Sequence, residues 1–251
     1  MDARAVLARF DREMRAEPAA EPAIERRWVD GVLRAEGAFS RIDWWDFPAV
    51  RAGEIARRES AYFARRPLEW KLYSHDRPPG VAGALADAGF AAEEPETFLA
   101  IAVSDVGPAE APDGVEIRIA RGASGAADFA AVSAAAFGRP GAAELDAALG
   151  RLEDPGQLVF IAYAEGSPVA GGRLELPAGR AFAGLYGGGV APAWRGRGLY
   201  RALVLARAAE ARSRSYAWLT VDALETSRPV LERMGFQPLA SVQGWSLSGE
   251  L

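Results

Sequence analysis

The sequence contains no cysteine, and this absence removes several kinds of chemistry at once. Disulfide bonds, thiolate metal sites and cysteine nucleophiles are all excluded. The 251 residues include one histidine, His75, which argues against a zinc centre. We therefore expect chemistry that uses no metal ion.

Long apolar runs are also missing, since the longest, such as residues 158–164, fall far short of the roughly 20 residues that a membrane span needs. The N-terminal residues show no signal-peptide pattern. The 29 basic and 34 acidic residues give a net charge of −5 without a long basic block, which argues against nucleic-acid binding. We expect a cytoplasmic protein with no membrane and no nucleic-acid partner.

Lysine is nearly absent as well, because Lys71 is the single one in the chain. Arginine therefore supplies almost every cation, and its planar guanidinium can bind phosphate through two hydrogen bonds. Any anion site in this protein should depend on arginine.

Residues 69–90 are similar to residues 215–236, and both segments predict a strand, a helix, a Gly-Phe pair and a further strand. At one fixed offset the matching pairs are Trp70 with Tyr216, Asp76 with Asp222, Leu85 with Leu231, and Gly89-Phe90 with Gly235-Phe236. Glycine just past a helix end is a common left-handed cap. We interpret the similarity as a duplication, although such a unit also recurs by chance in α/β proteins.

The periodic pattern is lost at residues 104–114, where Pro108, Pro112 and Gly114 stand among small and acidic residues. We predict a first domain at 1–103, a linker at 104–114 and a second domain at 115–251. In the first domain, helices at 3–15 and 48–65 and strands at 28–33 and 39–43 precede the repeat. In the second domain, the elements predicted before the repeat are a strand at 115–119, helices at 123–137 and 142–152, strands at 158–164, 168–176 and 180–190, and a helix at 198–212. This order predicts a mixed α/β fold with a partly antiparallel sheet flanked by helices.

Residues 185–203 predict a strand, a tight basic loop and the start of a helix. Gly196 and Gly198 let the backbone approach a ligand, and the N–H groups of the first helical turn point into the loop. With the helix dipole these groups form an anion site, to which Arg195 and Arg197 add charge. The expected ligand carries phosphate, while Leu199 faces the sheet and holds the loop in register.

Three consecutive glycines, residues 187–189, lie near the end of the preceding strand. Glycine within a strand suggests a bulge, which leaves backbone donors and acceptors unpaired. An extended ligand that contains amides can pair with these groups as another strand does, and the pantetheine arm of coenzyme A has that character. This segment is therefore a second indication of a coenzyme A site.

The run 190–198 resembles the acyl-CoA pyrophosphate loop of the GNAT superfamily of N-acetyltransferases, whose core pattern is Arg/Gln-x-x-Gly-x-Gly/Ala. Arg195 and Gly198 match this pattern, whereas Tyr200 stands at its final position. Residues 222–223 and 227–236 resemble the strand and helix that close the family's core. The resemblance covers residues 115–251 and reaches the first half only through the repeat. It implies two tandem GNAT-like halves, of which the N-terminal copy is degenerate.

The resemblance implies an N-acetyltransferase that passes an acetyl or other acyl group directly from acetyl-CoA to a primary amine of a small molecule or peptide. The implied coenzyme A residues are Gly188, Gly189, Val190, Arg195, Gly196, Arg197, Gly198, Leu199, Tyr200 and Ser227. Many members have a tyrosine at the position of Leu231 that protonates the leaving thiolate. Because this chain has leucine there, the alternative to an enzyme is a non-catalytic acyl-CoA-binding or sensor module. The acceptor and the preferred acyl chain stay open.

The transfer requires a neutral amine, and neutralising an amine with a pKa of about 10.4 costs roughly 4 to 5 kcal/mol at pH 7. Candidate bases are Glu175, Tyr186 and Asp222, and the sequence does not choose among them. Glu175 alternates with apolar neighbours, which also fits an exposed side chain. Backbone N–H groups near residues 188–190 are candidate oxyanion donors, and Tyr200 is the candidate acid because of its position.

Other interpretations of the loop are a solvated turn and a dinucleotide-binding turn. Gly196 and Gly198 follow a strand and Asp222 lies about 20 residues further on, as a dinucleotide fingerprint requires. However, Arg201 occupies the place of the third glycine. A Walker loop is excluded because the chain has no Gly-Lys-Ser/Thr sequence.

The first half has several aromatic residues but no equivalent glycine-arginine turn. His75 could be catalytic or structural, and Trp44, Trp45 and Trp70 could line a substrate pocket or pack in an interdomain core. We expect one coenzyme A per chain, with the N-terminal half shaping the acceptor pocket or the surface of a possible homodimer.

Overall fold

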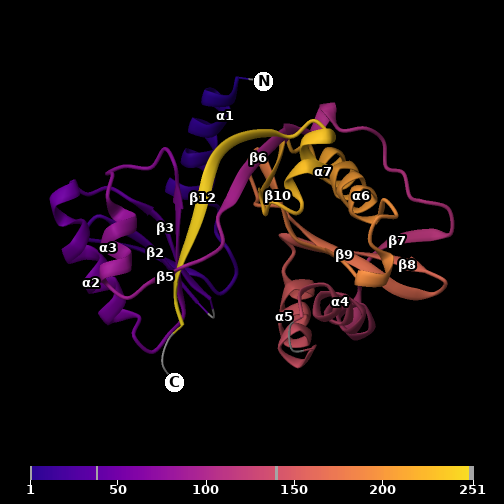
Figure 1. Ribbon diagram of the computed structural model, residues 1–251, viewed down its shortest axis with the longest axis horizontal. Helices are drawn as coiled ribbons and strands as arrows, with labels where there is room; N and C mark the ends of the chain where they lie inside the picture. The colour runs from indigo at the N-terminus through magenta and orange to yellow at the C-terminus, as the bar shows by residue number, and fades with distance from the viewer. Residues whose placement is uncertain (1, 38, 139–140, 249–251) are drawn as a thin grey trace. The chain divides into compact units, whose positions relative to one another are not determined.

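The computed structural model describes residues 2–37, 39–138 and 141–248. The chain forms two compact units, the first made of Met1–Leu99, Asp222–Arg228 and Pro238–Leu251, and the second of Ala100–Val221 and Pro229–Gln237. It passes from the first to the second within strand β6 (Glu96–Ala102) (Figure 1). No helix in the described residues is long and apolar enough to cross a membrane.

The first unit contains a sheet in the order β1-β2-β3-β4-β12, with the short β5 also paired to β12. Its strands are β1 (Glu25–Val29), β2 (Val32–Glu36), β3 (Ser40–Trp45), β4 (Leu68–Tyr73), β5 (Ala91–Ala92) and β12 (Gln237–Leu247). Its helices are α1 (Ala3–Phe10) with the π-helical η1 (Asp11–Ala16), η2 (Ala49–Arg51) with α2 (Ala52–Tyr62), and α3 (Val81–Asp87). Pairing is antiparallel except between β3 and β4.

The predicted strand at 28–33 is wrong, because this segment turns back on itself. Val29 and Val32 are paired at the ends of two antiparallel strands, β1 and β2. The two residues between them, Asp30 and Gly31, have φ values of 46° and 84°. An Asp-Gly pair with two positive φ angles is typical of a tight hairpin turn. The apolar residues on both sides of the pair concealed it in the sequence.

The first unit has an aromatic core of its own. Trp70 is completely buried on β4, and the Trp45 ring from β3 meets it edge to face at a centroid distance of 5.4 Å. Trp245 of β12 is opposite Trp70 in the register. Trp45 and Trp70 therefore lie in the core of the N-terminal unit itself.

The second unit has a sheet in the order β11-β10-β9-β8-β7, antiparallel except between β10 and β11. Its strands are β7 (Val115–Ile119), β8 (Gln157–Ala164), β9 (Ser167–Glu175), β10 (Phe182–Val190) and β11 (Trp218–Ala223). Its helices are α4 (Gly122–Phe137), α5 (Gly141–Glu153), α6 (Leu199–Ser213) and α7 (Arg228–Arg233). The order is the mixed, partly antiparallel α/β arrangement that the sequence predicts.

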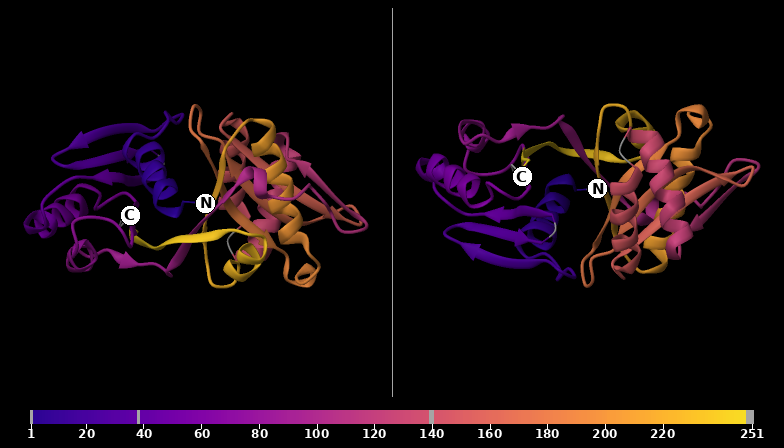
Figure 2. Two further views of the ribbon diagram at one scale, coloured as in Figure 1. Left: turned by 90° about the horizontal axis from the view of Figure 1, so that it is seen from above. Right: turned by 90° about the horizontal axis from the view of Figure 1, so that it is seen from below.

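Helices cover both faces of this second sheet. Figure 2 shows α6 in front of the strands in one view, and α4 and α5 in front of them in the opposite view. Two neighbouring glycines of β9 show which helix covers which face. A Cβ at Gly171 would meet Phe129 of α4, and a Cβ at Gly172 would meet Arg207 of α6. The sheet therefore has an α4 face and an α6 face.

Both copies of the sequence repeat end their helix in the same way. Gly89 and Gly235 have φ values of 90° and 97°. The following phenylalanines, Phe90 and Phe236, donate their N–H groups to the carbonyls five residues back, at 3.0 and 3.1 Å. This is the predicted left-handed glycine cap.

The predicted boundary at 104–114 lies just beyond the point where the chain enters the second unit. The structure also returns Asp222–Arg228 and Pro238–Leu251 to the first unit. The linear division into 1–103 and 115–251 therefore stays a prediction about functional domains.

Candidate active site

Strands β10 and β11 are paired only along their first residues. The parallel pairing covers three residues of each strand and ends at Gly184 and Thr220. β10 continues to Val190, so its later backbone groups on this edge have no partner in β11 among the described residues. An extended ligand with amide groups can bind there as an additional strand.

β10 contains the bulge that its glycines predict. Its register against β9 shifts between Tyr186 and Gly189, and Gly187 has a φ of 55°. Gly189 packs closely on α4, since a Cβ there would lie 2.7 Å from the Cβ of Ala136. Glycine is therefore required at residue 187 for the backbone conformation and at residue 189 for the packing.

The loop of residues 191–198 leads from β10, through the 3₁₀ turn η4 (Pro192–Trp194), into α6. Gly196 and Gly198 have φ values of 76° and 78°. Gly198 is the N-cap of this 15-residue helix and, because it has no side chain, makes no side-chain capping hydrogen bond. Residues 195–198 are exposed. The uncapped helix start is thus suited to an anion from solution.

The two arginines of this loop have different surroundings. Arg195 donates from Nε to the Val190 carbonyl and from Nη2 to the Ala136 carbonyl, both at 3.2 Å. The Arg197 guanidinium lies over the ring of Trp194, 4.6 Å from its centroid. Arg195 therefore also ties the loop to β10 and α4, a role that the sequence did not indicate.

Glu175 and Tyr186, two of the predicted bases, lie on the α4 face. Arg173 is opposite Tyr186 in the register and two residues from Glu175 on β9, so strand alternation places all three on one face. The Arg173 Nη1 is 3.4 Å from the Glu175 Oε1, and its guanidinium is 5.6 Å from the centroid of the Tyr186 ring. The structure thus brings these two candidates together in one partly exposed cluster.

Tyr200, the predicted acid, lies on the α6 face beside the bulge. A Cβ at Gly188 would lie 3.0 Å from the Tyr200 Cε2 and 3.5 Å from the Arg207 Nη2. Gly188 is therefore the point of β10 that both side chains approach. The sequence had placed only Tyr200 near this point.

Arg207 is a candidate functional residue that the sequence analysis missed. It is 1% exposed and donates to two backbone carbonyls, those of Leu203 and Arg173, each at 3.0 Å. No carboxylate in the described part of the chain forms an ion pair with it. Burial lowers the pKa of Arg207 to about 10, so that it is still charged at neutral pH. Its only sequence signal is an arginine among buried apolar residues of a helix.

Two predicted site residues belong to the first unit. The Asp222 Oδ2 is 2.8 Å from the Nζ of Lys71, so this candidate base is held in an ion pair. The Ser227 hydroxyl donates to the carbonyl of Leu224 at 3.1 Å in the turn before α7. Leu231, at the position of the family's tyrosine, is completely buried on α7. Among the described residues, no cluster of three or more His, Asp or Glu side chains could hold a metal ion.

The acetyltransferase (GNAT) family model matches residues 129–236, which run from α4 to the end of the repeat and include the loop and the bulge. Residues 129–236 are therefore similar in sequence to the GNAT acetyltransferase family. Members of this family use acetyl-CoA as the acyl donor and act on amine acceptors. No protein of curated function matches the sequence at a significant level.

Solved structures extend the similarity to the first unit. A GCN5-related N-acetyltransferase from Kribbella flavida is 17% identical, with a TM-score of 0.67 over 99% of this chain and 95% of that one. A tandem GNAT protein from the clavulanic acid biosynthesis pathway is 16% identical, with a TM-score of 0.62 over 93% and 86% of the two chains. A conserved protein of unknown function from Staphylococcus epidermidis is 11% identical, with a TM-score of 0.68 over 96% and 98%. At these identities the likeness concerns the fold, which is the predicted GNAT fold.

Proposed function

We propose that this protein transfers an acetyl or longer acyl group from its coenzyme A thioester directly to a primary amine of a small molecule or peptide. The observation that carries the proposal is the opened edge of β10 leading into an uncapped helix start at Gly198. The edge suits the amides of the pantetheine arm, and the helix start suits the pyrophosphate.

All but one of the donor-binding residues in this proposal come from one continuous segment, residues 188–200. Backbone groups of Gly188, Gly189 and Val190 pair with the pantetheine arm. The pyrophosphate binds at the exposed loop and the first turn of α6, with Arg195, Gly196, Arg197, Gly198, Leu199 and Tyr200. Leu199 contributes its backbone, because its side chain is 2% exposed and packs in the core. Ser227 is a further proposed contact.

In the proposed reaction the amine nitrogen forms a bond to the thioester carbonyl carbon, and the carbon–sulfur bond breaks. The proton of the attacking amine passes to Glu175, directly or through water, with Tyr186 beside it as the other candidate base. Backbone N–H groups near residues 188–190 stabilise the oxyanion. The departing thiolate receives the proton of the Tyr200 hydroxyl, which lies on the α6 face.

Arg207 supports this last step in the proposal. Its guanidinium approaches β10 at the same residue as Tyr200, and no carboxylate of the described residues forms an ion pair with it. A fixed positive charge in a buried site stabilises negative charge that develops nearby, on the phenolic oxygen or on the sulfur. In this proposal Tyr200, assisted by Arg207, takes the role of the tyrosine that many family members have at the position of Leu231.

The first unit has the same opened pair of parallel strands, but a side chain fills the opening. β3 and β4 pair only up to Ile42 and Trp70. Arg15 of η1 donates a bidentate pair of hydrogen bonds to the Asp76 carboxylate, at 2.7 and 2.8 Å. Its guanidinium is 4.2 Å from the ring centroid of Tyr73. We therefore propose that the N-terminal copy is degenerate and that each chain binds one coenzyme A.

A thiol-release assay with acetyl-CoA and a panel of small amines, peptides and amine-containing antibiotics tests the transfer. We expect turnover with at least one amine. Turnover should fall at least tenfold in Glu175→Gln, whereas Glu210→Gln, near the C-terminal end of α6, should stay active. Binding of acetyl-CoA without turnover of any amine would instead indicate the acyl-CoA-binding or sensor module.

Donor binding is tested separately by thermal melting and calorimetry. Acetyl-CoA should raise the melting temperature while NAD should not, because the opened strand edge suits pantetheine. Titration should give one site per chain. Equal stabilisation by NAD would contradict the donor assignment, and two equivalent sites would contradict the degenerate copy.

A further inference from the structure

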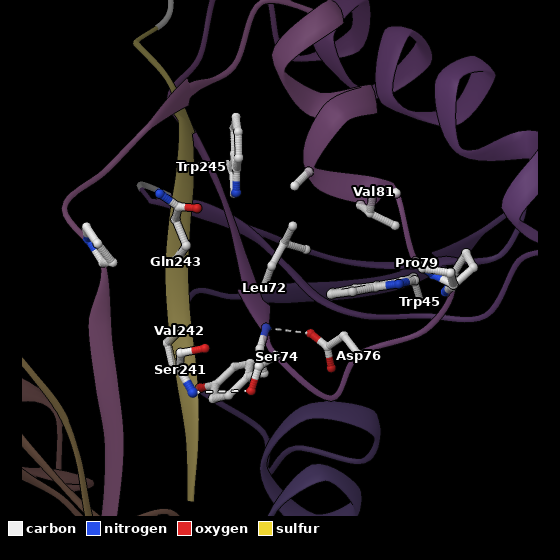
Figure 3. A pocket seen from close by; sticks show the side chains of 15 residues that line it. Trp45, Leu72, Ser74, Asp76, Pro79, Val81, Ser241, Val242, Gln243 and Trp245 are labelled. Carbon is white, nitrogen blue, oxygen red and sulfur yellow. Dashed lines mark hydrogen bonds between the residues drawn. The ribbon is translucent and has the colours of Figure 1, made fainter. Parts of the chain in front are cut away.

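The first unit contains a cavity of about 290 Å³ within its own structure, apart from the coenzyme A loop (Figure 3). Strands β3, β4 and β12 and the start of α3 surround it. Its walls are mainly apolar, formed by Trp45, Leu72, Pro79, Val81 and Trp245. This volume is at the lower end of the range for small-molecule sites.

Two tryptophans of the wall have hydrogen-bond donors without acceptors. Trp45 and Trp245 are 4% and 8% exposed, and neither indole Nε1 has a partner among the described residues. Figure 3 shows the nitrogen end of the Trp245 ring directed toward Leu72, into the cavity. An indole N–H can only donate, and leaving it buried and unpaired is unfavourable. These two donors have no acceptor among the described residues, and an occupant of the cavity can supply one.

The charge in the wall is already balanced. Asp76 is the one carboxylate among the lining residues, and it accepts hydrogen bonds from both terminal nitrogens of Arg15 and from the Tyr73 N–H. The Ser74 hydroxyl accepts from the Ser241 N–H at 3.2 Å. A charged ligand would find no opposite charge free to pair with it, so the occupant should be neutral.

We propose that this cavity is a binding site for a small neutral aromatic compound that carries a carbonyl oxygen, such as an aromatic amide. The carbonyl oxygen accepts from the Trp245 indole N–H, which is directed into the cavity, and the ring packs on the aromatic and aliphatic wall that includes Trp45. Trp45 already packs edge to face against Trp70 behind it, with an interplanar angle of 66°. The site is independent of the proposed transferase reaction, because it uses other residues in the other unit.

Acetanilide serves as the probe, and the seven indole N–H resonances of the ¹⁵N-tryptophan-labelled protein serve as the readout. We expect the Trp45 and Trp245 signals to shift saturably, because Trp245 gains an acceptor and Trp45 gains a ring contact. The signal of Trp28, which is 55% exposed on β1, should stay in place. The absence of a saturable shift at Trp45 and Trp245, or a proportional shift of all seven, would overturn the proposal.

A variant separates the hydrogen bond from the packing. Trp245→Phe removes the donor and keeps a ring, so acetanilide should bind roughly three- to tenfold more weakly, as expected for one lost hydrogen bond. Ethylbenzene, which has no acceptor, should bind both proteins alike, and the control Trp28→Phe should behave as wild type. Equal acetanilide affinity in wild type and Trp245→Phe would refute the role of the indole donor. The readout is binding alone, so a failed transferase assay leaves the result intact.

Discussion

Replacing Arg207 by methionine should lower turnover without lowering stability. Methionine keeps much of the length and removes the charge. Arg207 is 1% exposed and donates to two backbone carbonyls, so within the described part of the chain its buried charge has no carboxylate partner. Replacing a buried charge by an apolar side chain of similar size is often neutral or stabilising.

The expected pH dependence of stability also indicates that the Arg207 charge does not stabilise the fold. Burial holds the pKa of Arg207 at about 10 in the folded protein, below its ordinary value in the unfolded chain. The unfolded state therefore binds this proton more tightly, and the charged form opposes folding at every pH below about 10. As the pH rises above the folded pKa, this unfavourable contribution is progressively relieved. Arg207→Met should remove that rise and should keep or raise the melting temperature near neutral pH.

The expected loss of activity follows from the distance between charges. The Arg207 Nη2 and a ring carbon of Tyr200 both lie within 3.5 Å of one point, the Cβ position of Gly188. At an effective dielectric constant of about 20, removing a unit charge several ångströms from developing negative charge costs on the order of 2 kcal/mol. This corresponds to a roughly 30-fold decrease in kcat.

Steady-state thiol release and thermal melting on the same preparation measure both effects. Arg214→Met, on the exposed end of α6 where Arg214 pairs with Glu210, is the matched control and should change neither value. A folded Arg207→Met with wild-type kcat would refute the electrostatic role. A large fall in melting temperature would show instead that Arg207 stabilises the fold.

Three further variants test the bulge, the loop and the filled opening of the first unit. Gly189→Ala places a Cβ 2.7 Å from that of Ala136 and should destabilise the protein by about 1 to 3 kcal/mol in urea unfolding; unchanged stability would mean that α4 moves freely. Arg195→Ala should weaken coenzyme A binding by about 1.5 to 3 kcal/mol in calorimetry, and an unchanged Kd would show that the loop is only a turn. Arg15→Met leaves Asp76 buried without its cation, so unfolding should cost about 3 to 5 kcal/mol less, whereas an unchanged urea midpoint would mean that the pair is not formed in solution.

The sequence by itself determined the features that depend on local backbone conformation. The bulge of β10 and the turn at Gly196 and Gly198 were predictable because these positions need glycine whatever surrounds them. The capped helix ends before Phe90 and Phe236 were predictable for the same reason. The order of helices and strands in the second half followed from hydrophobic periodicity. The GNAT resemblance then connected the loop with acyl-CoA.

Only the tertiary structure decided which distant residues meet. The return of β12 to the first unit depends on strand pairing with β4, more than 160 residues earlier in the chain. The approach of Arg207 to Gly188, and of Arg15 to Asp76, depends on how a helix packs against a sheet. In the sequence these arginines look like the other charged residues around them. Burial and the absence or presence of a carboxylate partner give them their roles, and both are properties of the packed chain.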